Sequence, residues 1–131
     1  MKKIVLMMLL FASTNVLAEW TKVTESSTHG GFTAYADIQS IRKNGNKVKI
    51  WTLFDFKTVQ TVNNDRFLSS LARYEYDCFE ETTRLLDFYW YSGNMKTGDI
   101  VYSAPNQTVQ PKAVVPDSID KHLLEVACGG K

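Results

Sequence analysis

The chain has 131 residues, with 15 basic and 14 acidic side chains and a formal net charge of +1. This near balance argues against nucleic acid as a partner, because phosphate binding needs a concentrated basic surface. The length is that of a single domain.

Residues 1–18 have the features of a cleaved signal peptide. Two lysines give the positive start, residues 4–12 form an apolar run, and a small-residue cleavage pattern ends at Ala18. The apolar run is shorter than the ~20 residues of a membrane-spanning helix. We therefore expect cleavage after Ala18, one domain over residues 19–131, and no membrane span after cleavage.

The signal peptide also predicts where the protein resides. A short signal that begins with Met and two lysines is typical of bacteria, so we expect the periplasm, with release or display at the cell surface as the alternative. No cysteine lies next to the cleavage site. A lipid anchor on the mature N-terminus is therefore not expected.

Alternating side chains predict a chain made mostly of strands. The expected strands are residues 19–25, 32–37, 47–57 and 100–102, with two more inside residues 71–93. Gly30-Gly31 and Asn44-Gly45 are typical hairpin turns. Residues 58–70 are polar and irregular, which predicts a loop.

One helix is expected at the C-terminal end. It begins at Asp117 or Ser118, with Asp117 as the expected N-cap and Asp120 three positions on, and it ends at Gly129-Gly130. Its apolar residues recur at helical spacing. Neighbouring strands joined by hairpins and a single late helix predict an α+β fold: one antiparallel sheet of about five or six strands, with the helix packed on one face.

The two cysteines, Cys78 and Cys128, are expected to form one disulfide. Paired cysteines in an exported protein are most simply structural, and a separation of fifty residues is unlike a redox C-x-x-C motif. The bond would join the helix to the middle of the sheet.

The sequence resembles the surface-adhesin protein E family of exported bacterial proteins. The matching landmarks follow in order: Trp20, Tyr35-Ala36-Asp37, Ser40-Ile41, Gly45-Asn46, Val48, Trp51, Tyr76-Asp77-Cys78, Tyr91-Ser92-Gly93, Gly98, Val115-Pro116-Asp117-Ser118 and Cys128. The resemblance implies a small antiparallel sheet with a packed helix. It also implies binding to protein partners, among them host matrix glycoproteins. The family's adhesin carries a lipid on an N-terminal cysteine, which this chain lacks.

No residue set points to catalysis or to a bound metal. His29 lies in a glycine turn and His122 lies at the edge of the helix, and neither has further ligands at close spacing. No serine or cysteine is marked as a nucleophile. We therefore expect a protein that is not an enzyme and holds no cofactor.

The second face of the sheet, which carries apolar and aromatic side chains, is the strongest candidate for a partner surface. The residues that alternate away from the expected core are Trp51, Leu53, Leu85, Tyr89 and Tyr91. Exposed patches of this type mark interfaces, and a second copy of the chain is one candidate partner. Two other interpretations stay open: the inside and outside of one strand are reversed, or a loop such as residues 58–70 covers the patch.

These observations predict an exported, non-enzymatic binding protein that recognises protein partners through a sheet face and loops. A different class of function is a structural or accessory component of the periplasm or envelope. A third is a carrier of a hydrophobic ligand such as haem, which would use the aromatic patch with His29 or His122.

Overall fold

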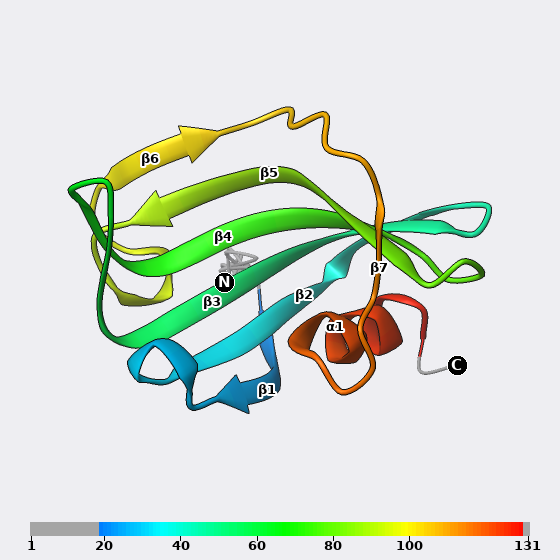
Figure 1. The fold of residues 1–131 in the computed structure, drawn as a ribbon, viewed down its shortest axis with the longest axis horizontal. Helices are drawn as coiled ribbons and strands as arrows, with labels where there is room; N and C mark the ends of the chain where they lie inside the picture. Colours follow the sequence, from blue (N-terminus) through cyan, green and yellow to red (C-terminus); the bar gives the residue numbers. More distant parts are fainter. Residues whose placement is uncertain (1–18, 130–131) are drawn as a thin grey trace, which may run out of the picture.

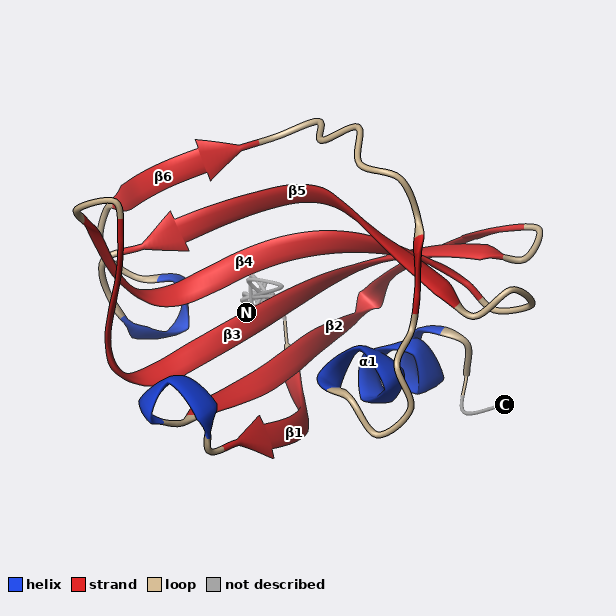
Figure 2. Ribbon diagram, viewed as in Figure 1, coloured by secondary structure: helices blue, strands red, loops and turns tan. Residues whose placement is uncertain are grey.

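The computed structural model of the protein describes residues 19–129, so the expected signal peptide lies outside the described part (Figure 1). Strands dominate these residues (Figure 2). The elements in chain order are β1 (Trp20–Ser26), the 3₁₀ turn η1 (Thr28–Gly30), β2 (Phe32–Asn44), β3 (Lys47–Val62), β4 (Asp65–Asp77), β5 (Thr82–Tyr91), the 3₁₀ turn η2 (Asn94–Lys96), β6 (Ile100–Ala104), β7 (Lys112–Ala113) and α1 (Ile119–Ala127).

The seven described strands form one antiparallel sheet. The order is β1-β2-β3-β4-β5-β6, so each strand pairs with the one before it in the sequence, and the two-residue β7 pairs with the start of β5. This confirms the expected fold class, with β7 as an addition to the five or six strands predicted. Neighbours in sequence pair because tight hairpins join them, as at Gly45-Asn46, where Asn44 faces Lys47.

Residues 58–70, predicted to be a loop, continue the sheet instead. β3 extends to Val62 and β4 begins at Asp65, with Asn63 and Asn64 as the turn, both at positive φ. Gln60 faces Phe67 across this extension. The polar residues there reflect the exposure of the hairpin rather than a break in the strands, so composition misled the sequence analysis.

Two pairing irregularities interrupt the pairing of β3 with its neighbours. One lies between Asp37 and Arg42 on β2, and the other between Asp55 and Gln60 on β3. Extra residues on one strand of a pair bend it and increase its twist. The sheet is accordingly twisted and curved, with α1 against one end of it (Figure 1).

The helix packs on one face of the sheet, which we call the helix face. Its buried residues are Leu123, Leu124 and Ala127, and they meet Ala36, Val48, Ile50 and Tyr76 of β2, β3 and β4. Ser118 is the N-cap, and its Oγ accepts a hydrogen bond from the Lys121 backbone N–H at 3.2 Å. The predicted cap, Asp117, is therefore wrong by one residue.

The predicted disulfide is confirmed. Cys78, in the turn after β4, is bonded to Cys128 at the end of α1, with their Cα atoms 5.9 Å apart. The bond joins the end of the helix to the β4–β5 turn and not to the middle of the sheet as expected, because β4 ends at Asp77, one residue before the cysteine. It thereby fixes where the helix lies on the sheet.

Candidate binding surfaces

A cluster of aromatic side chains lies on the helix face beside α1; Phe32, Phe56 and Phe67 are buried in it, and Phe54, Phe88 and Trp90 are partly exposed. A nine-residue helix is about 13 Å long, whereas the 16 residues of β3 extend over roughly 50 Å before bending. The helix therefore covers one end only. We call the rest the aromatic trough; its residues are Phe32, Phe54, Phe56, Phe67, Phe88 and Trp90.

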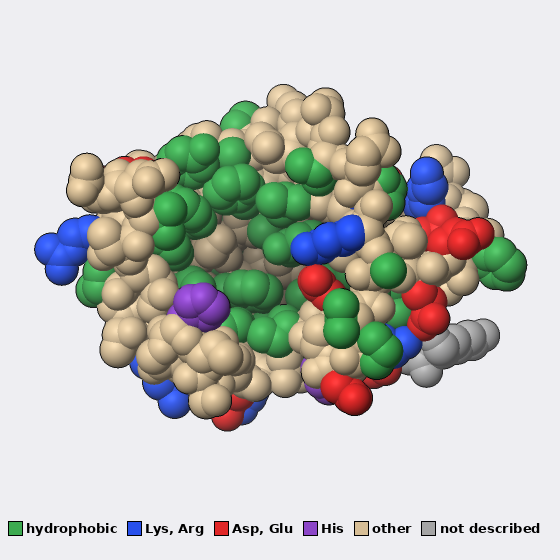
Figure 3. Space-filling view, in the orientation of Figure 1, with side chains coloured by type: hydrophobic (Ala, Val, Ile, Leu, Met, Phe, Trp, Pro, Cys, Tyr) green, Lys and Arg blue, Asp and Glu red, His purple; other side chains and the backbone are tan. Residues whose placement is uncertain are grey.

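The trough is hollowed along its length. One hollow of about 320 Å³ lies between η1 and the end of the β3–β4 hairpin, and a second of about 260 Å³ lies over β4 and β5. The two share Phe54, Phe56 and Phe67 as lining residues. Figure 3 shows apolar side chains gathered in this hollow beside the helix.

Stacked rings give the trough a stiff wall. The Phe67 and Trp90 rings are nearly parallel at 10°, with centroids 4.3 Å apart. Tyr102 of β6 extends the stack, 4.8 Å from Trp90, and is 41% exposed. Rings held by one another lose little freedom when a partner binds, which suits them to recognition.

Few polar groups line the trough. His29 lies at its rim in η1, 6.3 Å from the Phe32 ring. Gln60 ties this rim to β3, because its Nε2 donates to the backbone oxygens of His29 and Thr58, each at 2.9 Å. The site can therefore bind apolar groups, with one imidazole at its edge.

Three residues of the predicted patch lie together on the opposite face, which we call the back face. Trp51 and Tyr89 stack with centroids 6.4 Å apart, and Arg73 lies 5.5 Å from the Trp51 ring. Tyr91 continues the row along β5. Partial burial, and then the neighbouring Tyr89, raise the pKa of Tyr91. All three rings are only half-exposed.

Leu53 was predicted to be exposed, and that prediction is wrong. Its exposed fraction is 0%. It lies directly opposite Tyr35 of β2 and Leu71 of β4, and side chains in such pairs are close enough to cover one another. Leu53 therefore packs within the back face and offers no contact to a partner.

Leu85 was placed on the wrong face. A bulge in β5 leaves Leu86 as an extra residue, because Arg73 pairs with Asp87 while the next residue, Tyr74, pairs with Leu85. One extra residue reverses the alternation of a strand. Leu85 consequently lines the second hollow of the trough.

The trough itself was not predicted. Phe54, Phe56, Phe88 and Trp90 carry the alternation of the helix face and were expected to be core, as Phe56 is. The partial exposure of the other three rings depends on the length of the helix, which leaves part of that face open. Phe67 was missed for a second reason, since it lies in the segment predicted to be a loop.

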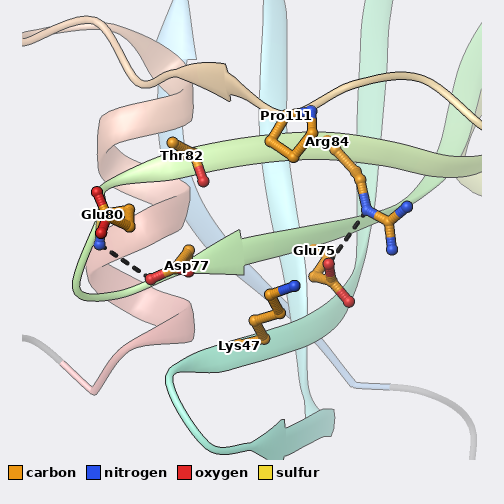
Figure 4. A pocket seen from close by; sticks show the side chains of 7 residues that line it. All are labelled: Lys47, Glu75, Asp77, Glu80, Thr82, Arg84 and Pro111. Atoms are coloured by element: carbon orange, nitrogen blue, oxygen red, sulfur yellow. Dashed lines mark hydrogen bonds and ion pairs between the residues drawn. The ribbon is translucent and has the colours of Figure 1, made fainter.

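A charged hollow of about 270 Å³ lies at the other end of the sheet (Figure 4). Arg84 Nε is 3.1 Å from Glu75 Oε1, and Asp77 Oδ1 accepts from the backbone N–H of Glu80 at 2.9 Å. Lys47 faces Asp77 across the strands. The Arg84–Glu75 ion pair and the Asp77 hydrogen bond to the turn favour a structural role for this hollow.

Neither histidine belongs to a group of possible metal ligands in the described residues. His122 is exposed on α1 and His29 lies at the trough rim. Residues 19–129 contain no group of three or more His, Cys, Asp or Glu side chains placed to hold a metal ion. Within the same residues, no helix is long and apolar enough to cross a membrane.

Comparison with known proteins gives a consistent result. The model of the family described as surface-adhesin protein E matches residues 20–129. One structure of Haemophilus influenzae protein E has 13% identity and a TM-score of 0.64, with 88% of each chain covered. Its crystal form II has 14% identity and a TM-score of 0.61, covering 73% of this chain and 80% of that one. At such identities these structures share the fold alone. No curated protein sequence matched.

Proposed function

Because the chain belongs to the surface-adhesin protein E family, we propose that it is an exported, non-enzymatic binding protein that recognises protein partners through the aromatic trough. The observation that supports this best is the row of stacked, partly exposed rings that lines the hollows beside the helix. Exposed aromatic surface of this kind is typical of interfaces. The stiffness of the rings lowers the cost of ordering them on binding.

Membership of the surface-adhesin family also supports a location outside the cytoplasm. We propose cleavage after Ala18, with the mature chain in the periplasm or at the cell surface and without a lipid anchor. Host matrix glycoproteins and envelope components are then the partners to test. A protein confined to the periplasm would meet only the envelope components.

Paired variants test which face binds. Purified mature protein is applied to immobilised matrix glycoproteins and to isolated envelope fractions. Tyr102→Ser removes an exposed ring beside the trough, and Trp51→Ala with Tyr89→Ala removes rings on the back face. We expect about tenfold weaker binding for the trough variant and little change for the back-face variant.

Weaker binding by the back-face variant, with little change in the trough variant, would mean that partners bind the back face. Its contacts would then be Trp51, Tyr89 and Tyr91. Light scattering of the same samples tests self-association, which the double back-face variant would abolish if a second copy bound there. Periplasmic retention without any matrix binding would favour the structural or accessory role in the envelope.

A second candidate function is carriage of a hydrophobic ligand such as haem. It is favoured by one observation: the imidazole of His29 lies at the rim of an apolar hollow of about 320 Å³. An absorbance titration with haem tests it, with His29→Ala and His122→Ala as the comparison. A Soret shift that the His29 variant loses and the His122 variant keeps is the expected result, and an unshifted band ends this candidate.

A further inference from the structure

Phe79, at the tip of the β4–β5 hairpin, is an exposed aromatic residue that packs in neither apolar cluster of the described residues. It has 77% of its surface exposed, more than the other exposed large apolar side chains of residues 19–129. A polar side chain would serve a surface turn equally well, so the fold does not explain the ring.

The backbone that carries Phe79 is held firmly. Asp77 Oδ1 accepts hydrogen bonds from the backbone N–H groups of Phe79 at 3.0 Å and of Glu80 at 2.9 Å. Cys78, the residue before, is bonded to Cys128, and its backbone N–H donates to the Asn46 oxygen at 2.8 Å. The ring is therefore presented from a fixed base.

Glu81, two residues after Phe79, is fixed as well. The Glu81 backbone oxygen accepts from the Val114 N–H at 2.9 Å, and its carboxylate lies 2.6 Å from Lys121 Nζ. The tip is thus tied to the helix and to the segment that precedes it. A side chain on a rigid base loses little backbone entropy on binding, which is the property of an interface anchor.

Acidic residues flank Phe79 along the turn. Asp77 faces Lys47 across the strands, and Glu81 is paired with Lys121. Glu80 is exposed and makes none of the ion pairs found in residues 19–129. Figure 3 shows acidic side chains beside a projecting apolar group at this end, and Figure 4 shows Glu80 and Asp77 on the turn.

We propose that Phe79 and Glu80 form a docking knob for a protein partner with an apolar pocket rimmed by Lys or Arg. The ring would fill the pocket, and the Glu80 carboxylate would pair with the basic rim. The carboxylate of Glu80 disfavours an anionic lipid surface, which attracts basic segments instead. The β4–β5 turn that carries the knob lies at the opposite end of the sheet from the β3–β4 hairpin beside the trough (Figure 1), so the knob does not depend on what the trough binds.

A random peptide library displayed on phage tests the chemistry of this surface. Selection is made on the mature, oxidised protein, and enriched peptides are titrated against Phe79→Ala, Glu80→Lys and the control Ile100→Ala. Ile100 is also exposed, at 52%, but lies on β6. Circular dichroism and the mass of the disulfide form verify that each variant is folded.

We expect enriched peptides that combine Lys or Arg with large apolar residues. Their affinity should fall by at least about tenfold in the two knob variants, stay unchanged in Ile100→Ala, and weaken as salt is added. Failure to enrich any peptide, peptides without basic residues, or equal binding to Phe79→Ala would overturn the proposal. Binding of the protein to phosphatidylglycerol vesicles that requires Phe79 would also overturn it, in favour of membrane contact.

Discussion

At the scale of single residues, Arg73 explains why the rings of the back face are held in place. Its Nε donates to Asp87 Oδ2 at 2.6 Å, and its guanidinium lies over the Trp51 ring. Asp87 is 4% exposed, and its other oxygen accepts from the Asn106 N–H at 2.9 Å. Trp51 thus has partners within the chain, and it stays partly exposed on the back face.

The burial of Leu53 leads to a prediction about stability. Leu53→Ala should lower the free energy of unfolding by about 2–5 kcal/mol, since it leaves a cavity in a packed position. The half-buried Leu85, changed to alanine, should cost clearly less. Urea unfolding of both variants measures the difference. Equal, small losses of unfolding free energy in the two variants would contradict the burial of Leu53 and indicate that it is exposed.

Tyr74 and Tyr76 predict a loss of stability in alkali. Burial, and then the charge of Asp120, raise the pKa of Tyr74 to about 12 and raise that of Tyr76 as well. A tyrosine whose pKa is raised by folding stabilises the protein fully below its unfolded pKa, about 10. That contribution is lost as the pH rises from there through the folded pKa.

Urea unfolding between pH 8 and 11.5 measures this decline. Tyr76→Phe keeps the ring and removes the titrating group, so we expect its free energy of unfolding to fall less steeply above pH 10 than that of the wild type. Tyr102→Phe, at an exposed ring, is the control and should follow the wild type. Parallel curves for the Tyr76 variant and the wild type would contradict the assignment.

At the scale of elements, α1 is held by its apolar face and by the disulfide. The face packs against β2, β3 and β4, but nine residues are too few for a helix that is stable alone. Attachment through Cys128 keeps the last turn against the hairpin that presents Phe79. The bond therefore supports the knob as well as the helix.

Replacing both cysteines by serine should lower the free energy of unfolding by about 2–4 kcal/mol, because the bond closes a long loop in the unfolded chain. Hydrogen exchange should rise most in α1 and in the β4–β5 turn, with the centre of the sheet less affected. Wild type under reducing conditions serves as a second sample with the same expected change. Uniform exchange across the sheet would contradict a local role for the bond.

At the scale of the whole molecule, the structure is a curved sheet whose two ends differ. One end carries the helix, the disulfide and the acidic knob, and the other carries the apolar trough (Figures 1 and 3). Two separate surfaces would let one small domain contact two partners, or two regions of the same partner, at once. The proposed variants at each end can be combined to measure whether the contacts are independent.

Export is the prediction that concerns the complete chain. We expect a mature protein that begins at Glu19, carries one disulfide and no lipid, and is recovered from the periplasm or the cell surface. Cell fractionation followed by intact mass spectrometry measures all of these. A product that retains residues 1–18 in the membrane fraction would contradict cleavage.

The sequence alone determined the features that depend on neighbouring residues. Alternation, the Asn44-Gly45 turn and the helical spacing of apolar residues act locally, so the strands, the helix and the sheet type could be predicted from them. The disulfide followed because an exported chain with two cysteines offers one pairing. The family landmarks supplied the same fold independently.

Only the tertiary structure decided which surfaces are open. The bulge at Leu86 appears only when β5 is placed against β4, and it moves Leu85 to the other face. Leu53 is buried because Tyr35 and Leu71, distant in sequence, lie beside it. The trough is open because the helix, fixed at one end of the sheet, is shorter than the strands. The face of Leu85, the burial of Leu53 and the opening of the trough all depend on how distant segments pair and cover one another. Local sequence pattern does not encode this.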